Sequence, residues 1–209
     1  MNRTRMIGLA LVAVAVFIGS MAVIPAAMGS ARAPGAVHGS NATTRGTSDE
    51  LATQLAAARL ATAKYALNLK QAKKDGYFIL TRAIPGMGYH FLNPAITGFD
   101  ITKPPILVYE KHGHTWQLGA FEWVFPETPA TPPLEGATYG SFGAACHYHD
   151  GTFVFEPSES VCPEMSPETG SPFRFWHPDL VTMHVWAWYP NPDGLYAGMN
   201  PFTDPFSPA

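Results

Sequence analysis

The stretch Val181–Pro190, VTMHVWAWYP, decides the predicted fold, because β-branched and aromatic residues make up almost all of it. This composition indicates a strand from Val181 to Tyr189, whose side chains alternate between two faces. On that strand His184 would share a face with Thr182, Trp186 and Trp188. An ionisable ring set among indoles is the first candidate for a functional group.

The rest of the chain predicts an α+β fold. Residues 48–76 begin with a Ser48 cap, end at Gly76 and carry apolar residues at spacings of four and three, which is typical of one long helix. Strand-like runs follow at 77–80 and 152–155, with a hairpin at 106–125. We therefore expect a long N-terminal helix packed on an antiparallel β-sheet, with long Pro- and Gly-rich loops such as residues 85–105.

The N-terminus predicts export. Residues 1–28 carry Arg3 and Arg5 ahead of an apolar run, which indicates a signal peptide, or an N-terminal anchor because the run is long enough to span a bilayer. Residues 29–47 are typical of a flexible linker, and residues 48–209 of a single globular domain. We expect an extracytoplasmic protein, secreted or associated with the cell envelope, that touches the membrane only through an uncleaved N-terminal segment.

Charge and motifs exclude several classes of function. Residues 76–209 contain four basic and thirteen acidic side chains, a formal balance of −9. Because phosphate binding needs clustered Lys and Arg, nucleic acid is not an expected partner. The chain also contains no GxSxG, HExxH, GxxxxGK[ST] or GxGxxG motif, so serine hydrolysis and nucleotide chemistry have no support.

The two cysteines, Cys146 and Cys162, frame a 17-residue segment. An oxidising compartment favours a disulfide between them. The alternative takes the sequence CHYH, with Cys146, His147 and His149, as a set of metal ligands.

Three residues in separate segments stand out by chemistry. Glu122 lies on a run that is apolar on both faces, and a buried carboxylate needs a cation, a hydrogen-bond donor or a proton. His184 repeats that pattern, and His90 lies in a loop shaped by glycines. Each also has a simpler interpretation. Glu122 could lie on an edge strand and contact solvent, Lys111 or Arg82. His184 could be a core histidine that hydrogen-bonds to backbone, and His90 could be a solvated loop histidine.

Other polar residues are weaker candidates. Glu110 is close to the predicted hairpin tip, where His112 and His114 form an exposed pair. His147 or His149 could supply a second polar group to a site. His38 and His177 have no predicted role.

The combination of DGY, PGMGYHFLNP, LGAFEWVF and MHVWAWYPNPDGLYAGMNP resembles a largely uncharacterised family of exported bacterial proteins. That family has an MGxHxxN loop, a GxEY-type strand and an HVWxW…NPxGxxAxxNP C-terminal segment. The resemblance covers roughly residues 60–202 and implies importance for His90, Glu122 and His184. It also implies supporting roles for Asn93, Tyr109, Glu110, Trp186, Asn191, Gly194 and Asn200. The chain departs from the pattern at Phe121 and in the Cys146–Cys162 segment.

Two histidines and a carboxylate are the composition of an open mononuclear site for Zn(II), Cu(II) or Fe(II). We expect His90, Glu122 and His184 to form such a site and to bind metal, or to support metal-dependent catalysis on a small molecule, in an aromatic pocket. The pocket residues would be Trp116, Trp186, Trp188, Asn93 and Glu110. One alternative is a metal-free module of the cell envelope that binds small molecules, and another is a structural or interaction domain on a tether.

Overall fold

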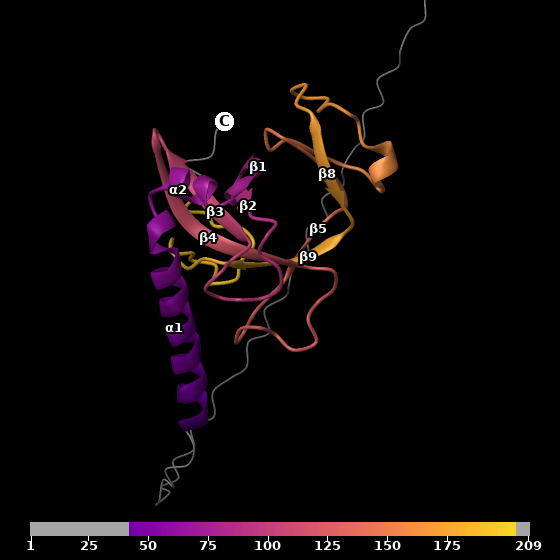
Figure 1. Cartoon of the computed structure of the whole chain (residues 1–209). Coiled ribbons are helices and arrows are strands. Elements are labelled where there is room, and N and C mark those ends of the chain that lie inside the picture. The colour runs from indigo at the N-terminus through magenta and orange to yellow at the C-terminus, as the bar shows by residue number, and fades with distance from the viewer. Residues whose placement is uncertain (1–41, 204–209) are drawn as a thin grey trace, which may run out of the picture. The chain divides into compact units, whose positions relative to one another are not determined.

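In residues 42–203, which are the residues that the computed structural model describes, β-strands are the main regular structure (Figure 1). Six strands form one antiparallel sheet in the order β1-β2-β3-β4-β9-β5, curled into a half-barrel. Their bounds are β1 Phe78–Ile84, β2 Gly88–Leu92, β3 Ile106–His112, β4 Thr115–Phe125, β5 Gly140–Phe142 and β9 Leu180–Val185.

A smaller antiparallel sheet contains three strands in the order β7-β6-β8. They are β6 Ala145–Tyr148, β7 Phe153–Phe155 and β8 Phe173–His177, with a short 3-10 helix η2 at Glu159–Val161. The backbone N–H of Arg82 on β1 donates to the Gly151 carbonyl at 2.8 Å, which ties this sheet to the larger one. Of these three strands the sequence predicted only β7, as the run at residues 152–155, since runs of three to five residues carry little periodicity.

The predicted long helix over residues 48–76, packed on a sheet, is wrong. The helix α1 spans Ala42–Thr62, a 3-10 turn η1 follows at Ala63–Tyr65, and a separate short helix α2 spans Leu69–Lys74. Between residues 49 and 62 only Ala58 and Thr62 are buried, so α1 does not cover the sheet as expected. The fold is mostly β rather than an even α+β mixture.

Hydrogen bonds from the sheet explain the break in the helix. The Tyr65 carbonyl accepts from the Tyr109 hydroxyl at 2.8 Å, and the Ala66 carbonyl accepts from the Leu118 N–H at 2.8 Å. In a continuous helix these carbonyls would accept from N–H groups four residues ahead. The Asn68 side chain then accepts from the Gln71 N–H and begins α2 as its N-cap.

A β-bulge in β4 decides which side chains face each side of the large sheet. Val108 pairs with Ala120 while the next residue, Tyr109, pairs with Leu118, so Gly119 is an extra residue. Leu118 consequently packs in the main core with Phe121 and not beside Ala120. Strict alternation predicted that Trp116 and Leu118 would share the face of Glu122, and the bulge is the reason that they do not.

Two other element predictions change. Residues 85–105 were expected to be irregular, but β2 lies within them and pairs with both β1 and β3. The final strand ends at Val185 rather than Tyr189, and the Trp186 N–H donates to the Leu195 carbonyl. The hairpin predicted at residues 106–125 is confirmed as β3 and β4.

Cys146 and Cys162 form a disulfide, with their Cα atoms 5.8 Å apart. The bond joins β6 to the end of η2 and confirms the predicted pairing, so Cys146 is not a metal ligand. A disulfide is compatible with an extracytoplasmic protein.

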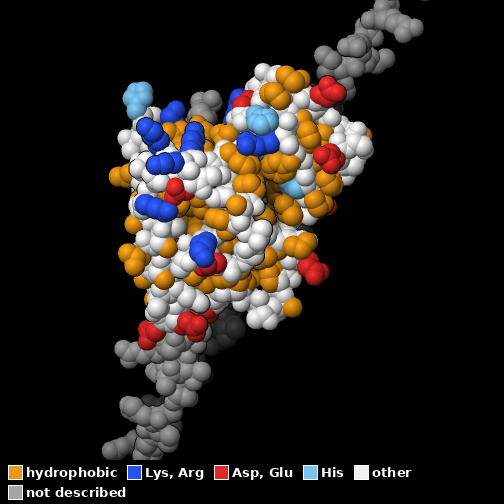
Figure 2. Space-filling model, viewed as in Figure 1, with side chains coloured by type: hydrophobic (Ala, Val, Ile, Leu, Met, Phe, Trp, Pro, Cys, Tyr) orange, Lys and Arg blue, Asp and Glu red, His pale blue; other side chains and the backbone are white. Residues whose placement is uncertain are grey.

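Positive charge gathers at η1 and α2, where Lys64, Lys70, Lys73 and Lys74 are exposed (Figure 2). The predicted signal peptide or anchor at 1–28 lies outside the described residues, as does most of the predicted linker at 29–47, although α1 begins at Ala42. Within residues 42–203 no helix combines the length and the apolar character that a bilayer span requires.

Candidate metal centre

Neighbouring strands bring the three predicted residues together. Glu122 on β4 is the register partner of His184 on β9, and it also pairs with Ile106 on β3. His90 on β2 pairs with Val108, two residues along β3 from Ile106. Side chains two residues apart on a strand share a face, so all three functional groups project from one side of the sheet.

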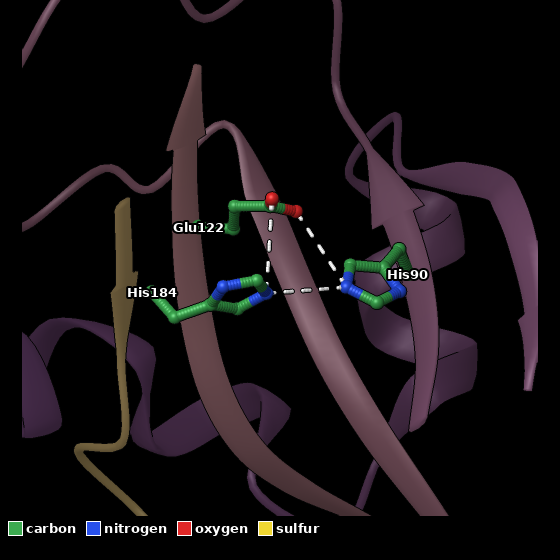
Figure 3. A group of neighbouring side chains, drawn as sticks. All are labelled: His90, Glu122 and His184. Carbon is green, nitrogen blue, oxygen red and sulfur yellow. Dashed lines mark hydrogen bonds and ion pairs between the residues drawn. The ribbon is translucent and has the colours of Figure 1, made fainter. Parts of the chain in front are cut away.

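The functional atoms converge on one point (Figure 3). Nε2 of His90 lies 3.4 Å from Nε2 of His184. The two carboxylate oxygens of Glu122 each approach one ring, at 3.6 Å from His90 Nε2 and 3.7 Å from His184 Nε2. One ligand atom from each of the three residues lies within 4.8 Å of the ligand atoms of the other two.

These separations are those of ligands around an ion. Two atoms bound to Zn(II) at about 2.0–2.1 Å, at the tetrahedral angle, lie roughly 3.3–3.4 Å from each other. The 3.4 Å between the two Nε2 atoms agrees with that value, and each of these nitrogens has a different oxygen of Glu122 at a distance within a few tenths of an ångström of that value. All three distances are too long for strong hydrogen bonds. The three side chains are therefore better placed to hold a metal ion than to hydrogen-bond to one another.

Burial controls the protonation of this group. His90, Glu122 and His184 are 3%, 7% and 4% exposed. Desolvation raises the pKa of Glu122 to about 8 and lowers the pKa of His184 to about 4. The pKa of His90 falls to about 3, through desolvation first and the nearby His184 second. Without a metal, the carboxyl group therefore keeps its proton at neutral pH while both imidazoles are uncharged.

Neighbouring side chains orient the histidine rings. Nδ1 of His90 lies 2.9 Å from the Thr81 hydroxyl, and Thr81 is the register partner of His90 on β1. The His184 ring stacks on Trp186, with ring centroids 6.5 Å apart and planes 17° apart. Both histidines present Nε2 to the common point, and for His90 the contact of Nδ1 with Thr81 fixes this orientation.

A cavity of about 300 Å³ opens beside the cluster, between the large sheet and the small one. His90 and Glu122 lie in its wall, and so do His147 and His177 of the small sheet. The remaining wall is chiefly apolar and includes Leu80, Ile84, Leu92, Ile106, Val124, Phe142, Phe175 and Leu180. A small molecule in this cavity would contact His90 and Glu122 on a wall that is otherwise mostly apolar.

The five residues expected to form the pocket do not line this cavity. Trp116 and Trp188 pack against the main core, where Trp188 donates to the Thr62 hydroxyl at 3.0 Å. Trp186 stacks on His184 and donates to the Ala197 carbonyl at 2.7 Å. The Asn93 amide donates to the Asp75 carbonyl at 2.9 Å, and Glu110 is buried beside Gly88.

Thr81 and His177 contribute to the cavity but were not predicted. Thr81 lies in an apolar run with no motif around it, so only the pairing of β1 with β2 reveals its position. His177 follows Phe173 and Phe175 at alternate positions, and this aromatic alternation was the available signal for a strand with one inward histidine.

Comparisons of the chain with protein-family models, with curated proteins and with solved structures find no match.

Proposed function

We propose that the protein binds a divalent transition-metal ion through His90, Glu122 and His184, and that the adjoining cavity accepts a small, mostly apolar molecule. The convergence of three buried ligand atoms on one point carries this proposal. Two imidazoles and one carboxylate suit Zn(II), Cu(II) and Fe(II).

Three protein ligands leave coordination positions open. An ion held by this set would keep a position for water or for a donor atom of a bound molecule, as catalytic metal sites do. Glu122 and His90 both border the cavity, so an open position would face it. The chemistry supplied there would be polarisation of a ligand oxygen or activation of water.

Metal content provides the direct test. The full chain, exported by its host and purified without a chelator or an affinity tag, is analysed by mass spectrometry for Zn, Cu and Fe. We expect about one ion per chain in the wild-type protein and a loss of that ion in His184→Ala. The matched control is His114→Ala, which alters an exposed histidine at the β3–β4 turn and should keep the ion.

The opposite result is equally clear. If wild-type protein contains no metal, and takes none up when Zn(II), Cu(II) and Fe(II) are added in turn, the three residues do not form a metal site.

The protonation pattern favours one second candidate, which is metal-free binding of a small molecule. A neutral carboxylic acid at Glu122 and neutral imidazoles at His90 and His184 can exchange hydrogen bonds with an uncharged ligand. Binding of small apolar or aromatic compounds that survives dialysis against a chelator would favour this candidate over the first.

We infer that the protein acts outside the cytoplasm. The Cys146–Cys162 disulfide supports this location, because such bonds persist in oxidising compartments. Detection of the reduced thiols in protein taken directly from its host would contradict it.

A further inference from the structure

A second pair of histidines lies on the wall of the same cavity, on the small sheet. Nε2 of His147 on β6 is 3.0 Å from Nε2 of His177 at the end of β8. Both residues line the cavity, and neither belongs to the candidate metal centre. His147 is 1% exposed, while His177 is half-buried.

Backbone carbonyls fix the tautomer of each ring. Nδ1 of His147 lies 3.2 Å from the Leu80 carbonyl oxygen, and Nδ1 of His177 lies 2.6 Å from the Pro178 carbonyl oxygen. A carbonyl oxygen only accepts, so each Nδ1 must carry the hydrogen. In the neutral imidazole the other nitrogen is then bare. Two bare Nε2 atoms thus face each other at 3.0 Å.

Such a pair is unfavourable unless a cation joins it, because two lone pairs repel at this distance. A proton carried on the His147 ring is disfavoured, since that ring is buried against aromatic rings. Its ring stacks on Phe175 with centroids 5.0 Å apart and planes 15° apart, and Phe142 lies on it at 6.2 Å and 25°. Apolar burial disfavours the charged imidazolium, whereas neutral imidazole remains an effective metal ligand.

We propose that His147 and His177 form a second position for a divalent transition-metal ion, separate from the cluster of His90, Glu122 and His184. Imidazole nitrogens bound at about 2.0–2.1 Å and separated by 3.0 Å subtend an angle of roughly 95° at the metal. That angle suits adjacent positions of a square-planar or tetragonal ion, and Cu(II) prefers this geometry. Two neutral ligands bind more weakly than a set that includes a carboxylate, so this ion is expected to leave first.

Adjacent residues of β1 support both positions. The Leu80 carbonyl orients His147, and the Thr81 hydroxyl orients His90. The two positions consequently border one cavity from opposite sheets. The second position does not depend on the first, because the two share no ligand.

Copper titration of the metal-free full chain tests this inference. Equilibrium dialysis gives the number of Cu(II) ions bound per chain, and electron paramagnetic resonance reports the bound nitrogens. The wild-type protein is expected to bind two ions. His177→Gln should bind one and lose the spectrum of the two-nitrogen species, and the half-buried position of His177 makes this variant milder than a change at His147.

Two further variants keep the two proposals distinguishable. The double variant His90→Ala/His184→Ala should lose the tighter ion and retain the His147–His177 ion, and His114→Gln should retain both. If His177→Gln binds as many ions as the wild-type protein, or if the wild-type protein shows no species that His177→Gln removes, the inference is overturned. Loss in His177→Gln without any loss in His90→Ala/His184→Ala would support this position and refute the metal centre. Circular dichroism establishes that each variant is folded.

Discussion

Glu122 and His184 are register partners on the adjacent antiparallel strands β4 and β9, and Oε1 of the first lies 3.7 Å from Nε2 of the second. Backbone hydrogen bonds of the ladder, rather than a loop, therefore set the distance between these two side chains. Ligands on rigid elements lose little conformational freedom on binding, which favours affinity for one ion geometry.

Metal binding is expected to release a proton from Glu122. Burial raises the pKa of this carboxyl group to about 8, so it is protonated at pH 6.5–7 in the metal-free protein, and the metal needs the carboxylate. Calorimetric titration with Zn(II) in buffers of different ionisation enthalpy should give about one proton released per ion. Glu122→Gln should release none under the same conditions. Equal proton release by the wild-type protein and Glu122→Gln would mean that the proton comes from a group other than Glu122.

Stability of the metal-free protein should fall between pH 6.5 and 8. The folded pKa of Glu122, about 8, exceeds the usual 4.5, so in this range the unfolded chain has lost a proton that the folded chain still holds. The free energy of unfolding therefore falls as the pH rises, by about 2 kcal/mol between pH 6.5 and 8. His90 and His184 have lowered pKa values, and the opposing gain in stability that they cause with rising pH lies mostly below pH 6.5.

Urea denaturation at several pH values measures this slope. Glu122→Gln, which has no such proton, should be flat relative to the wild-type protein between pH 6.5 and 8. Parallel curves for the two proteins would mean that Glu122 is already ionised at pH 6.5.

Thr81→Val should weaken metal binding without removing a ligand. The Thr81 hydroxyl lies 2.9 Å from Nδ1 of His90 and orients that ring. Loss of such an outer partner typically lowers metal affinity about 10–100-fold. Thr182→Val, on the same cavity wall, is the control and should bind Zn(II) like the wild-type protein. Competition with a coloured zinc chelator measures both, and unchanged affinity in Thr81→Val would show that the hydroxyl is dispensable.

Gly88→Ala should destabilise the fold. Gly88 has a φ of +87°, and an added Cβ would overlap Oε1 of Glu110 and lie 2.6 Å from the Tyr109 carbonyl oxygen. Strain and overlap together are expected to cost about 2–4 kcal/mol in the free energy of unfolding. Gly98→Ala is the matched control, because its φ is +73° but its Cβ would meet nothing within 4 Å. Its cost should be about 1 kcal/mol, from backbone strain alone. Similar values for both variants would show that both the Glu110 side chain and the Tyr109 carbonyl group move aside.

The sequence predicts the three candidate ligands better than it predicts the fold. His90, Glu122 and His184 are each an ionisable group in apolar or glycine-rich surroundings, and that contrast is visible locally. Their common face depends on pairing between strands, which depends in turn on long-range hydrogen bonds. The Tyr65 carbonyl shows the same limit, because the residue that ends the helix, Tyr109, is 44 positions away.

The residues expected to line the pocket do not line the cavity beside Glu122, and for Trp116 the bulge at Gly119 is the cause. Alternation along β4 is regular on each side of this residue but out of phase across it, so Trp116 faces the main core while Glu122 faces the cavity. Nothing in the letters LGAF distinguishes a bulge from an ordinary pair of small residues. His177 was overlooked although Phe173, Phe175 and His177 alternate along β8, because one short alternating run among loop residues is a weak local signal.

The irregular segment after Val185 closes a strand edge. The Trp188 and Tyr189 N–H groups both donate to the Gly119 carbonyl at 3.0 Å, at the point on β4 where pairing with β9 stops. Farther along, the Asn200 N–H donates to the Gly86 carbonyl at 2.7 Å in the β1–β2 turn. Open edges of sheets are templates for pairing with another chain. Residues 186–200 therefore help to keep copies of the protein from aggregating edge to edge, although they contain no strand.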